Sequence, residues 1–368
     1  MWFNRLMRYN WQQDDWPDFT YDLSEVSGAL SEISLLSGRV TGLVDGFSDG
    51  MEVEAMLDLM IAEAIETSDI EGESLQHEDV KSSIKNNLGL NVIHDQVADQ
   101  RAEGVAELIV LARNQFDQPL SEAMLLEWHS LLLKGVKNLP VGEWRSGETA
   151  MRVLSGRIGN PTVHFEAPPS AEVSNEMQSF ISWFNESRSV LAGPVRAAIA
   201  HLYFESIHPF EDGNGRIGRA IAEKALSQGL GFPALMSLSK SINANKRDYY
   251  KALETAQRRN KITPWLNYFI DIILDAQQSS EKEIHFVLKK AKFYRKYEDL
   301  LNQRQHRGVE RMFGAGASGF TGGMNAQKYI GITKTSKATA TRDLQDLLAK
   351  SALIVIGAGR NTRYELNL

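Results

Sequence analysis

Residues 208–219 read HPFEDGNGRIGR, and this stretch decides how the rest of the chain is interpreted. Pro209 disfavours helical geometry at the residue before it, so the chain is expected to turn there. Gly213 and Gly215 allow backbone angles that other residues avoid, and they let a ligand approach the main chain. Helical character resumes at Arg216, so the free N–H groups of a first helical turn face this loop. A loop in this position attracts anions.

Charged side chains in the same stretch suit a polyphosphate and a proton transfer. Arg216 and Arg219 occupy neighbouring positions of the expected helix and add full positive charges. Asp212 offers a hard oxygen ligand where Mg²⁺ could bridge to phosphates. His208 carries an imidazole, which can accept a proton near neutral pH. Each feature alone has a structural explanation, such as a tight turn or a helix cap. Together, at a helix boundary, they predict a phosphate site.

The stretch resembles the signature of the Fic family, which is His-Pro-Phe, any residue, Asp or Glu, Gly-Asn-Gly-Arg, two residues and Arg. Every fixed position matches. The upstream run TSDIEG, from Thr67 to Gly72, is similar to the family's inhibitory pattern of Ser or Thr, three residues, Glu, and Gly or Asn. The segments DWPDF, SLQHEDVKSSI, VGEWRSG and VHFEAPP resemble the long bacterial subgroup with a C-terminal winged helix. The likeness therefore covers nearly the whole chain.

The resemblance implies a protein adenylyltransferase that depends on Mg²⁺ and ATP. Such an enzyme transfers AMP from ATP to a Ser, Thr or Tyr hydroxyl of a target protein or of itself, and releases pyrophosphate. It implies that His208 is the general base, that Asp212 holds Mg²⁺ and that Phe210 anchors the loop. The implied contacts to ATP and its phosphates are Gly213, Asn214, Gly215, Arg216, Ile217, Gly218 and Arg219. Among these, Arg219 is implied to hold the γ-phosphate.

Two further parts of a nucleotide site follow from the resemblance. Tyr249 and Tyr250 match the position that meets adenine, although one of two adjacent aromatics on a helix can serve packing alone. Gln257 stands where some relatives carry Asn. A flap, where a target segment adds a strand to an exposed edge, is implied at Thr162, Val163, His164 and Phe165. A surface hairpin without a role is the alternative to this flap.

Glu71 is expected to end a helix, because Gly72 suits a left-handed stop. The resemblance implies that Glu71 pairs with Arg219 and so keeps this cation from the γ-phosphate. An arginine–carboxylate pair is charge-assisted and can compete with a phosphate oxygen. A solvated carboxylate at the helix end is the structural alternative.

Composition narrows the class of protein. The chain has 368 residues, of which 43% are hydrophobic and 24% charged, as in soluble globular proteins. A net charge of −7 argues against a general electrostatic grip on nucleic acid or acidic lipid. The absence of cysteine excludes disulfides and thiolate metal sites, and the eight scattered histidines form no HExxH zinc motif. No apolar run approaches the ~18 residues that span a bilayer, so we expect a cytoplasmic location and no membrane partner.

The predicted fold is mainly α, with a Fic-type helical core, a short β-hairpin flap and a C-terminal winged-helix module. Within the second predicted helix, Met60 and Ala64 share the apolar face, while Glu63 is expected to face water. The predicted domains are an N-terminal helical region with the inhibitory helix (1–98), the Fic core (99–280), a helix with a Gly-rich linker (281–323) and the winged helix (324–368). Helical periodicity covers about 24–36, 53–65, 99–114, 121–133, 173–185, 194–207, 216–230, 246–259, 263–276 and 281–303.

The C-terminal segment carries the order helix, turn, helix and hairpin, with helices near 325–330 and 336–350 and strands near 353–356 and 362–366. Lys334, Lys337 and Arg342 lie near the second helix, whose Leu347 and Leu348 are expected to face inward. These cations could contact DNA phosphates. A protein-interaction or packing role is the alternative.

Other functions stay open at this point. The chain could be a transcription regulator whose Fic core senses a nucleotide without turnover, although an intact His208 favours catalysis. It could also use another nucleotide donor, remove AMP, or act as a growth inhibitor that Glu71 restrains. Relatives often dimerise, so a homodimer is a further expectation.

Overall fold

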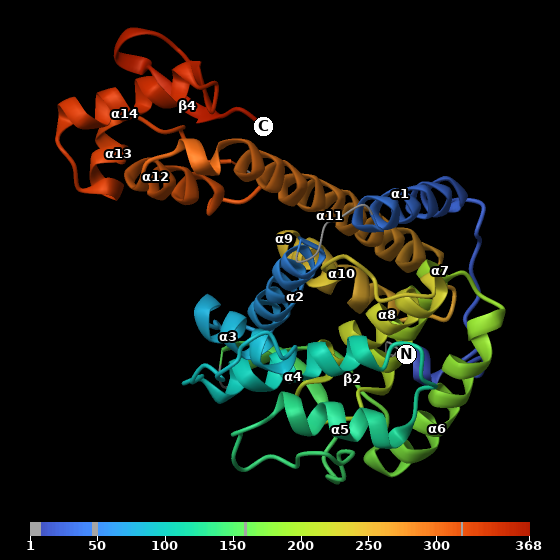
Figure 1. Ribbon diagram of the computed structural model, residues 1–368. Coiled ribbons are helices and arrows are strands. Elements are labelled where there is room, and N and C mark those ends of the chain that lie inside the picture. Colours follow the sequence, from blue (N-terminus) through green and yellow to red (C-terminus); the bar gives the residue numbers. More distant parts are fainter. Residues whose placement is uncertain (1–8, 46–50, 158–159, 318) are drawn as a thin grey trace. The chain divides into compact units, whose positions relative to one another are not determined.

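The computed structural model describes residues 9–45, 51–157, 160–317 and 319–368. The chain forms two compact units, the first of Met1–Gly38 with Met56–Gln278 and the second of Arg39–Ala55 with Ser279–Leu368. Most described residues are helical, as predicted, and four short strands form two separate two-stranded sheets (Figure 1). None of the described helices combines the length and the apolar character that a membrane span requires.

The helices of the first unit enclose one apolar core. Three helices contribute residues to both units: α1 (Ser27–Asp45), α2 (Met51–Ile70) and α11 (Thr263–Tyr297). The remaining helices of the first unit that matter here are α3 (His77–Asn87), α4 (Gln100–Asn114), α5 (Glu122–Leu132), α6 (Ser170–Glu186), α7 (Gly193–Ile207), α8 (Asn214–Leu230), α9 (Leu238–Ala244) and α10 (Lys246–Ala256).

Helix α7 is the central helix of this core. Every residue from Val195 to Ile207 is buried, and α8 packs along it. A helix that is buried on all sides has to be enclosed by its neighbours, and here Phe180 of α6 contacts Tyr203 and Phe204 of α7. The sequence that follows α7 therefore emerges from the middle of the core, and this places His208 at a rigid position.

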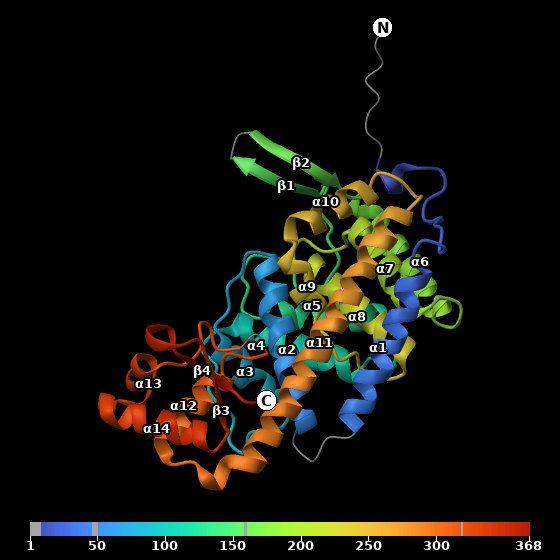
Figure 2. The same cartoon turned by 90° about the horizontal axis from the view of Figure 1, so that it is seen from above.

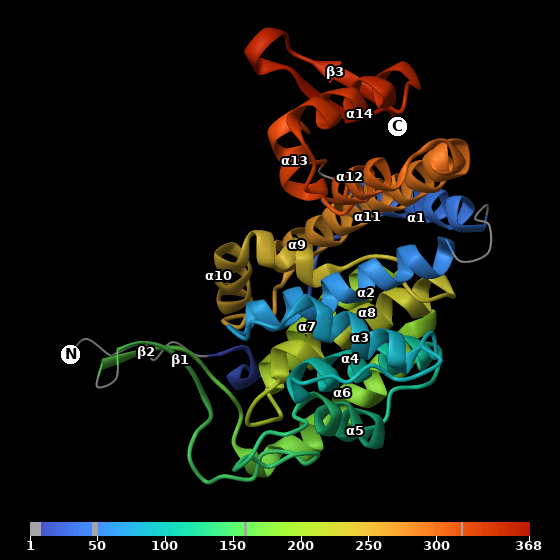
Figure 3. The same ribbon diagram turned by 60° about the vertical axis from the view of Figure 1, so that its left-hand side comes forward.

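Strands β1 (Arg152–Arg157) and β2 (Asn160–Glu166) form the predicted hairpin, in antiparallel register with Arg152 opposite Glu166. Figures 2 and 3 show it extending away from the helices of the first unit. The predicted turn spans 156–161, of which 158–159 lie outside the described residues. Phe165 is buried and packs edge-on against Tyr9, so this end of the hairpin is anchored.

Helix α11 runs without a break through the position where two helices were predicted. Residues 277–280, which separate the two predicted helices, are helical as well. Gln277 is buried and donates through Nε2 to Ser37 Oγ at 2.5 Å. Gln277 therefore has a polar partner on α1 and is accommodated within the helix.

The second unit has its own apolar core and contains α12 (Gln303–Phe313), α13 (Ala326–Thr333), α14 (Lys337–Ala349), β3 (Leu353–Ile356) and β4 (Arg363–Leu366). The predicted order of elements in the C-terminal segment is present. Leu344 and Leu347 are buried, but Leu348 is 37% exposed, so the expectation that it faces inward is wrong. One residue past Leu347 the helix has turned by about 100°, which carries Leu348 out of the buried stripe.

Glu63 was expected to face water, and this expectation is also wrong. Its side chain is 6% exposed, and its carboxylate accepts hydrogen bonds from the hydroxyls of Ser237 and Ser239 and from the Ser239 N–H. These donors lie at the start of α9, where free N–H groups favour an anion. Helix α2 is thereby tied to α9 by a buried polar contact.

Candidate functional site

The site begins at His208, which ends α7 in a left-handed conformation with φ 51° and ψ 59°. Such a conformation costs a histidine on the order of 1–3 kcal/mol, so its surroundings have to impose it. The His208 N–H caps the helix by donating to Phe204 O at 2.9 Å. The His208 carbonyl accepts from Arg145 Nε at 2.7 Å, and the buried Arg145 guanidinium also donates to Pro168 O. Sequence reasoning did not assign this role to Arg145.

Phe210 and Asn214 give the loop its shape. Phe210 is fully buried and stacks on His129 with ring centroids 3.9 Å apart. The Asn214 amide accepts from the Phe210 N–H at 3.0 Å and donates to the Phe210 carbonyl at 2.9 Å. Asn214, which was predicted to contact phosphates, thus binds the backbone of its own loop. Its role in a phosphate site would be to hold the loop in shape.

His129 is neutral and supports the loop that follows His208. Burial lowers the pKa of His129 to about 4. Its Nδ1 accepts from the Gly142 N–H at 2.9 Å, which leaves the proton on Nε2, 3.3 Å from the Asp212 carbonyl. His129 is a second supporting residue that the sequence did not reveal, because it lies 83 positions before its partner.

The start of α8 provides the cradle itself. Gly213 is its N-cap with φ 81°, and no side chain caps the first turn. A Cβ at Gly215 would lie 2.2 Å from Glu71 Oε1 and 3.1 Å from Arg219 Nη1, so any side chain there would displace the Glu71 carboxylate. A carboxylate is therefore held directly against the glycine turn, where a phosphate oxygen would be expected. Ile217 and Gly218, also predicted to line the nucleotide, are buried in the helix behind it.

Arg219 is paired with Glu71, the residue implied by the resemblance. Its Nη2 lies 2.9 Å from Glu71 Oε1 and donates to Thr67 O at 3.0 Å, while its Nε donates to Thr67 Oγ1 at 2.8 Å. Arg219 is 1% exposed. Burial disfavours its charge, but Glu71, with smaller contributions from Tyr249 and Glu205, more than offsets this, so the pKa of the guanidinium is raised. Gly72 has φ 84°, the left-handed stop expected after Glu71.

Arg216 has a partner that sequence reasoning missed. Its Nη1 lies 2.9 Å from Glu73 Oε2, and its Nη2 lies 3.7 Å from Asp212 Oδ1. Both arginines of the loop are thus bound by carboxylates of one short segment that follows α2. The only sequence signal was a second glutamate two positions after Glu71.

Asp212 fits a role as a magnesium ligand. Its side chain is 49% exposed beside the cradle, and its Oδ1 accepts from the Gly213 N–H at 2.6 Å. Mg²⁺ commonly takes one or two carboxylates and completes its shell with substrate phosphates and water. Among the described residues there is no group of three or more acidic or histidine side chains that would bind a metal without a phosphate.

The two tyrosines predicted to meet adenine have different surroundings. Tyr249 is 1% exposed, and its hydroxyl lies 2.7 Å from His201 Nε2, so it belongs to the core. Tyr250 is 41% exposed and donates to the Ile70 carbonyl at the end of α2, at 3.0 Å. Gln257 is buried and donates to the Glu205 carbonyl at 3.0 Å. Of the pair, only Tyr250 is exposed and so accessible to a base.

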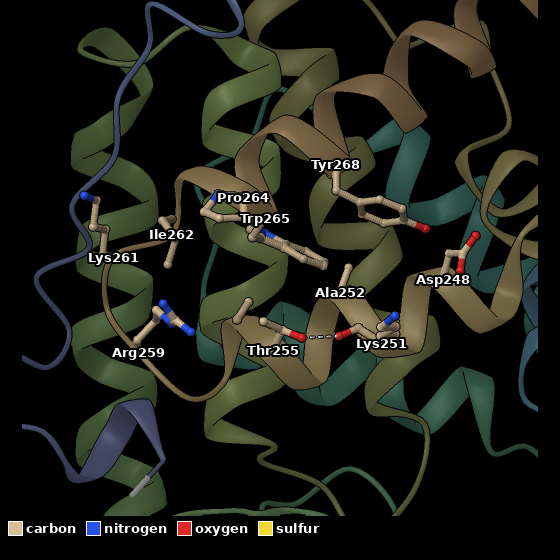
Figure 4. A pocket seen from close by; sticks show the side chains of 11 residues that line it. Asp248, Lys251, Ala252, Thr255, Arg259, Lys261, Ile262, Pro264, Trp265 and Tyr268 are labelled. Atoms are coloured by element: carbon tan, nitrogen blue, oxygen red, sulfur yellow. Dashed lines mark hydrogen bonds between the residues drawn. The ribbon is translucent and has the colours of Figure 1, made fainter.

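The four predicted flap residues also differ in their exposure. Thr162 and Val163 are exposed on β2, His164 Nδ1 lies 3.2 Å from Glu254 Oε2, and Phe165 is buried at the anchored end. A separate cavity of about 310 Å³ lies between α10 and the first turns of α11, and Lys251, Trp265 and Tyr268 are among the residues that line it (Figure 4). None of the predicted site residues lines this cavity.

Comparison with known families agrees with the loop geometry. Residues 119–226 match the family model described as Fic/DOC family. This stretch is a Fic/DOC domain. Residues 9–90 match a second model, described as a domain of unknown function, DUF4172. The Fic/DOC match contains α7, the His208 loop and most of α8, while Glu71 and Glu73 lie in the preceding match.

Curated relatives of the Fic/DOC domain are named as adenylyltransferases. A protein adenylyltransferase Fic of Culex quinquefasciatus is 31% identical over 148 residues, which cover 40% of this chain and 26% of that protein. A probable protein adenylyltransferase of Aquifex aeolicus is 29% identical over 156 residues, covering 42% of this chain and 43% of its own. The chain thus spans less than half the length of either relative.

Solved structures share the fold over a longer range. A Fic family protein from Desulfovibrio desulfuricans G20 has a TM-score of 0.58 at 20% identity and covers 95% of this chain and 98% of its own. A Fic-domain signaling protein from Bacteroides thetaiotaomicron has a TM-score of 0.53 at 20% identity, with 69% and 97% covered. At this identity the likeness concerns the fold alone.

Proposed function

We propose that this protein is an autoinhibited adenylyltransferase that transfers AMP from Mg²⁺-bound ATP to a hydroxyl of a protein target. The observation that carries the proposal is the loop between α7 and α8, where His208, uncapped helix N–H groups and two buried arginines converge. The names of the relatives support AMP as the transferred group. The exposed β1–β2 hairpin suits a target segment that adds a strand.

In the proposed reaction, the triphosphate lies along the glycine turn, with Arg219 at the γ-phosphate and Arg216 nearer the α- and β-phosphates. His208 takes the proton of the target hydroxyl while the hydroxyl oxygen forms a bond to the α-phosphorus. The bond from that phosphorus to the bridging oxygen breaks, and pyrophosphate leaves. Mg²⁺ held by Asp212 would neutralise phosphate charge. Such reactions depend mostly on positioning and on fixed charges, which the buried arginines provide.

Glu71 is proposed to inhibit this reaction. Its carboxylate takes Arg219 at 2.9 Å and lies against Gly215, so it competes with the γ-phosphate for charge and for space. Removing the carboxylate returns Arg219 to the nucleotide. We expect Glu71→Gly to raise AMP transfer by at least about tenfold, since a charge-assisted contact of 1.5–3 kcal/mol is exchanged for one to the substrate.

The measurement is incorporation of label from α-³²P-ATP into the protein itself or into lysate proteins, followed by mass spectrometry of the modified residue. Glu78→Gly, at an exposed glutamate of α3, is the matched control and should behave as wild type. Adding His208→Ala to Glu71→Gly should abolish labelling while Mg²⁺-ATP binding persists in calorimetry. Equal labelling in wild type and Glu71→Gly would refute the inhibition, and labelling without His208 would refute the base.

A second function is favoured by the charge of residues 324–368, which carry seven Lys or Arg and three Asp or Glu, a net charge of +4 in a chain of −7. Lys334, Lys337 and Arg342 are exposed around α14. We propose that this segment is a winged-helix module that contacts DNA phosphates. The module would then bring the proposed adenylyltransferase to DNA.

A further inference from the structure

Glu205 lies on α7, three residues before the proposed base, and has no role in the mechanism above. Its side chain is 6% exposed, and its Oε2 lies 3.6 Å from Nδ1 of His208. That distance is just beyond a hydrogen bond, so a shift of a few tenths of an ångström would form one. The left-handed turn at His208 directs the ring back toward the helix that carries Glu205.

The surroundings of the Glu205 carboxyl favour its charged form. Burial opposes the charge, but the nearby His208, His201 and Arg219 hold the pKa of the Glu205 carboxyl below its usual value. Other titratable and charged groups surround Glu205 and His208. They are His201 on α7, Arg219 on α8 with its partner Glu71, Tyr249 and Tyr250 on α10, and Arg145, which donates to the His208 carbonyl.

Several polar atoms of this cluster are buried without a hydrogen-bond partner among the described residues. They are Glu205 Oε1, His208 Nδ1, His201 Nδ1 and Arg219 Nη1. Buried polar atoms are nearly always paired, and leaving one unpaired costs about 1–3 kcal/mol, so a group of four calls for a functional explanation. A purely structural carboxylate would be expected to bind backbone N–H groups, whereas in the described part of the chain the carboxylate of Glu205 makes its ion-pair contact with the imidazole of His208.

The neighbouring helix leaves room for this carboxylate. A Cβ at Gly218 would lie 2.7 Å from Glu205 Oε1 and 3.1 Å from His201 Nδ1. Any larger residue on this face of α8 would therefore displace Glu205 from beneath the base. The glycine gives the carboxylate its place between the two central helices.

We propose that Glu205 is a positioning residue for His208. Its carboxylate faces Nδ1, which keeps the proton on that nitrogen and leaves Nε2 free to accept the proton of the incoming hydroxyl. The same negative charge stabilises the imidazolium that then forms. A carboxylate behind a histidine base performs this task in serine hydrolases. The inference rests on the proposed function, because it assigns a role within the same reaction.

The first experiment uses the full chain in the Glu71→Gly background and compares it with the same protein carrying Glu205→Gln. Glutamine keeps the shape and removes the charge. We expect kcat to fall by at least about tenfold, within the ~10²–10⁴ that a general base contributes, with the KM for ATP changed less than about twofold. The acidic limb of the rate profile should move to lower pH, because the imidazolium loses its counter-charge. Glu205→Asp should restore part of the rate.

The matched control is Glu223→Gln, which removes a buried carboxylate that pairs with Arg113 at 2.9 Å and does not face His208. It should leave kcat and the pH profile unchanged. A Glu205→Gln protein with the kcat and pH profile of its parent would overturn the inference. An equal fall in both glutamine variants would overturn it too, because the loss would then follow from a weakened core.

A second measurement needs no turnover and so separates the two proposals. Nitrogen-15 NMR of the His208 side chain in the wild-type chain should show a proton on Nδ1, and Glu205→Gln should redistribute it between the two nitrogens. If Glu71→Gly labels nothing but this tautomer is found, the proposed function fails and the positioning geometry stands. A proton on Nε2 in the wild-type chain would overturn the inference even if AMP transfer is observed.

Discussion

At the scale of single residues, the site is defined by cations that already have acidic partners. Arg219 is bound by Glu71 and Arg216 by Glu73, each at 2.9 Å. The Arg216 Nε is also buried without a partner among the described residues, so this side chain has capacity for a further acceptor. A nucleotide that enters the cradle therefore has to exchange two ion pairs, and only one of them was expected.

We predict that Glu73→Gln, introduced into the Glu71→Gly protein, tightens Mg²⁺-ATP binding by about 2- to 10-fold. The physical reason is that Arg216 no longer divides its charge between Glu73 and a phosphate. Calorimetric titration with Mg²⁺-ATP measures the effect. Glu78→Gln in the same background removes an exposed carboxylate from α3 and should change nothing. An unaltered affinity in Glu73→Gln would show that this pair does not compete with phosphate.

At the scale of elements, α2 is held against α9 and α10 by contacts along its length. Glu63 binds Ser237 and Ser239, Asn243 donates to Glu66 at 2.7 Å, and Tyr250 donates to the last helical carbonyl, that of Ile70. Lys246 adds a bond from Nζ to the Asp69 carbonyl at 3.1 Å. The inhibitory carboxylate at the end of α2 is thus presented by a firmly docked helix.

Weakening this docking should release part of the inhibition. We predict that Ser237→Ala combined with Ser239→Ala destabilises the fold by about 1–3 kcal/mol, because the buried Glu63 carboxylate loses its hydroxyl partners. Basal AMP transfer should rise, but less than in Glu71→Gly, since Glu71 itself remains. Hydrogen exchange of α2 amides and the labelling assay report the two effects. Faster exchange without more transfer would separate the docking of α2 from the inhibition.

At the scale of the whole molecule, a buried acid makes stability depend on pH. Burial raises the pKa of Glu223 to about 7 from 4.5, even though its neighbour Arg113 favours the charged form. The folded protein then holds this proton in a range where the unfolded chain has released it. Glu223 therefore contributes most to the free energy of unfolding at low pH. This contribution is lost as the pH rises from about 4.5 to about 7.

We predict that the thermal midpoint of wild type, measured relative to Glu223→Gln, falls between pH 5 and pH 7.5. Glutamine does not titrate, so the variant subtracts the pH dependence of all other groups. Differential scanning calorimetry at a series of pH values gives the comparison. A difference that is constant across this range would mean that Glu223 ionises as an ordinary carboxyl.

The second unit carries the remaining prediction. In gel shifts with the full chain, DNA binding should weaken steeply with salt, as expected when phosphate contacts release counterions. Reversing the charges of Lys334, Lys337 and Arg342 to Glu should abolish the shift without changing AMP transfer. Binding that survives this triple substitution, or no binding at low salt, would assign the module to protein interaction or packing.

Local sequence was enough to predict the features that depend on near neighbours. The turn at His208 follows from Pro209 and from the glycines that come after it, and the left-handed stop at Gly72 follows from its missing side chain. The mainly helical fold and the hairpin were also readable, because apolar spacing and turn residues act over a few positions. The pairing of Glu71 with Arg219 came from resemblance to a family rather than from local physics.

Only the tertiary structure decided which distant groups meet. Glu73 reaches Arg216 across 143 positions, and the Glu63 carboxylate, which was expected to face water, reaches Ser237 across 174. The gap predicted between two helices at 277–280 is part of α11, where the buried Gln277 side chain has Ser37 as its partner. A charged side chain is left out of water only when packing brings a partner to it, and packing of α2, α7, α8 and α9 around one core is a property of the folded chain.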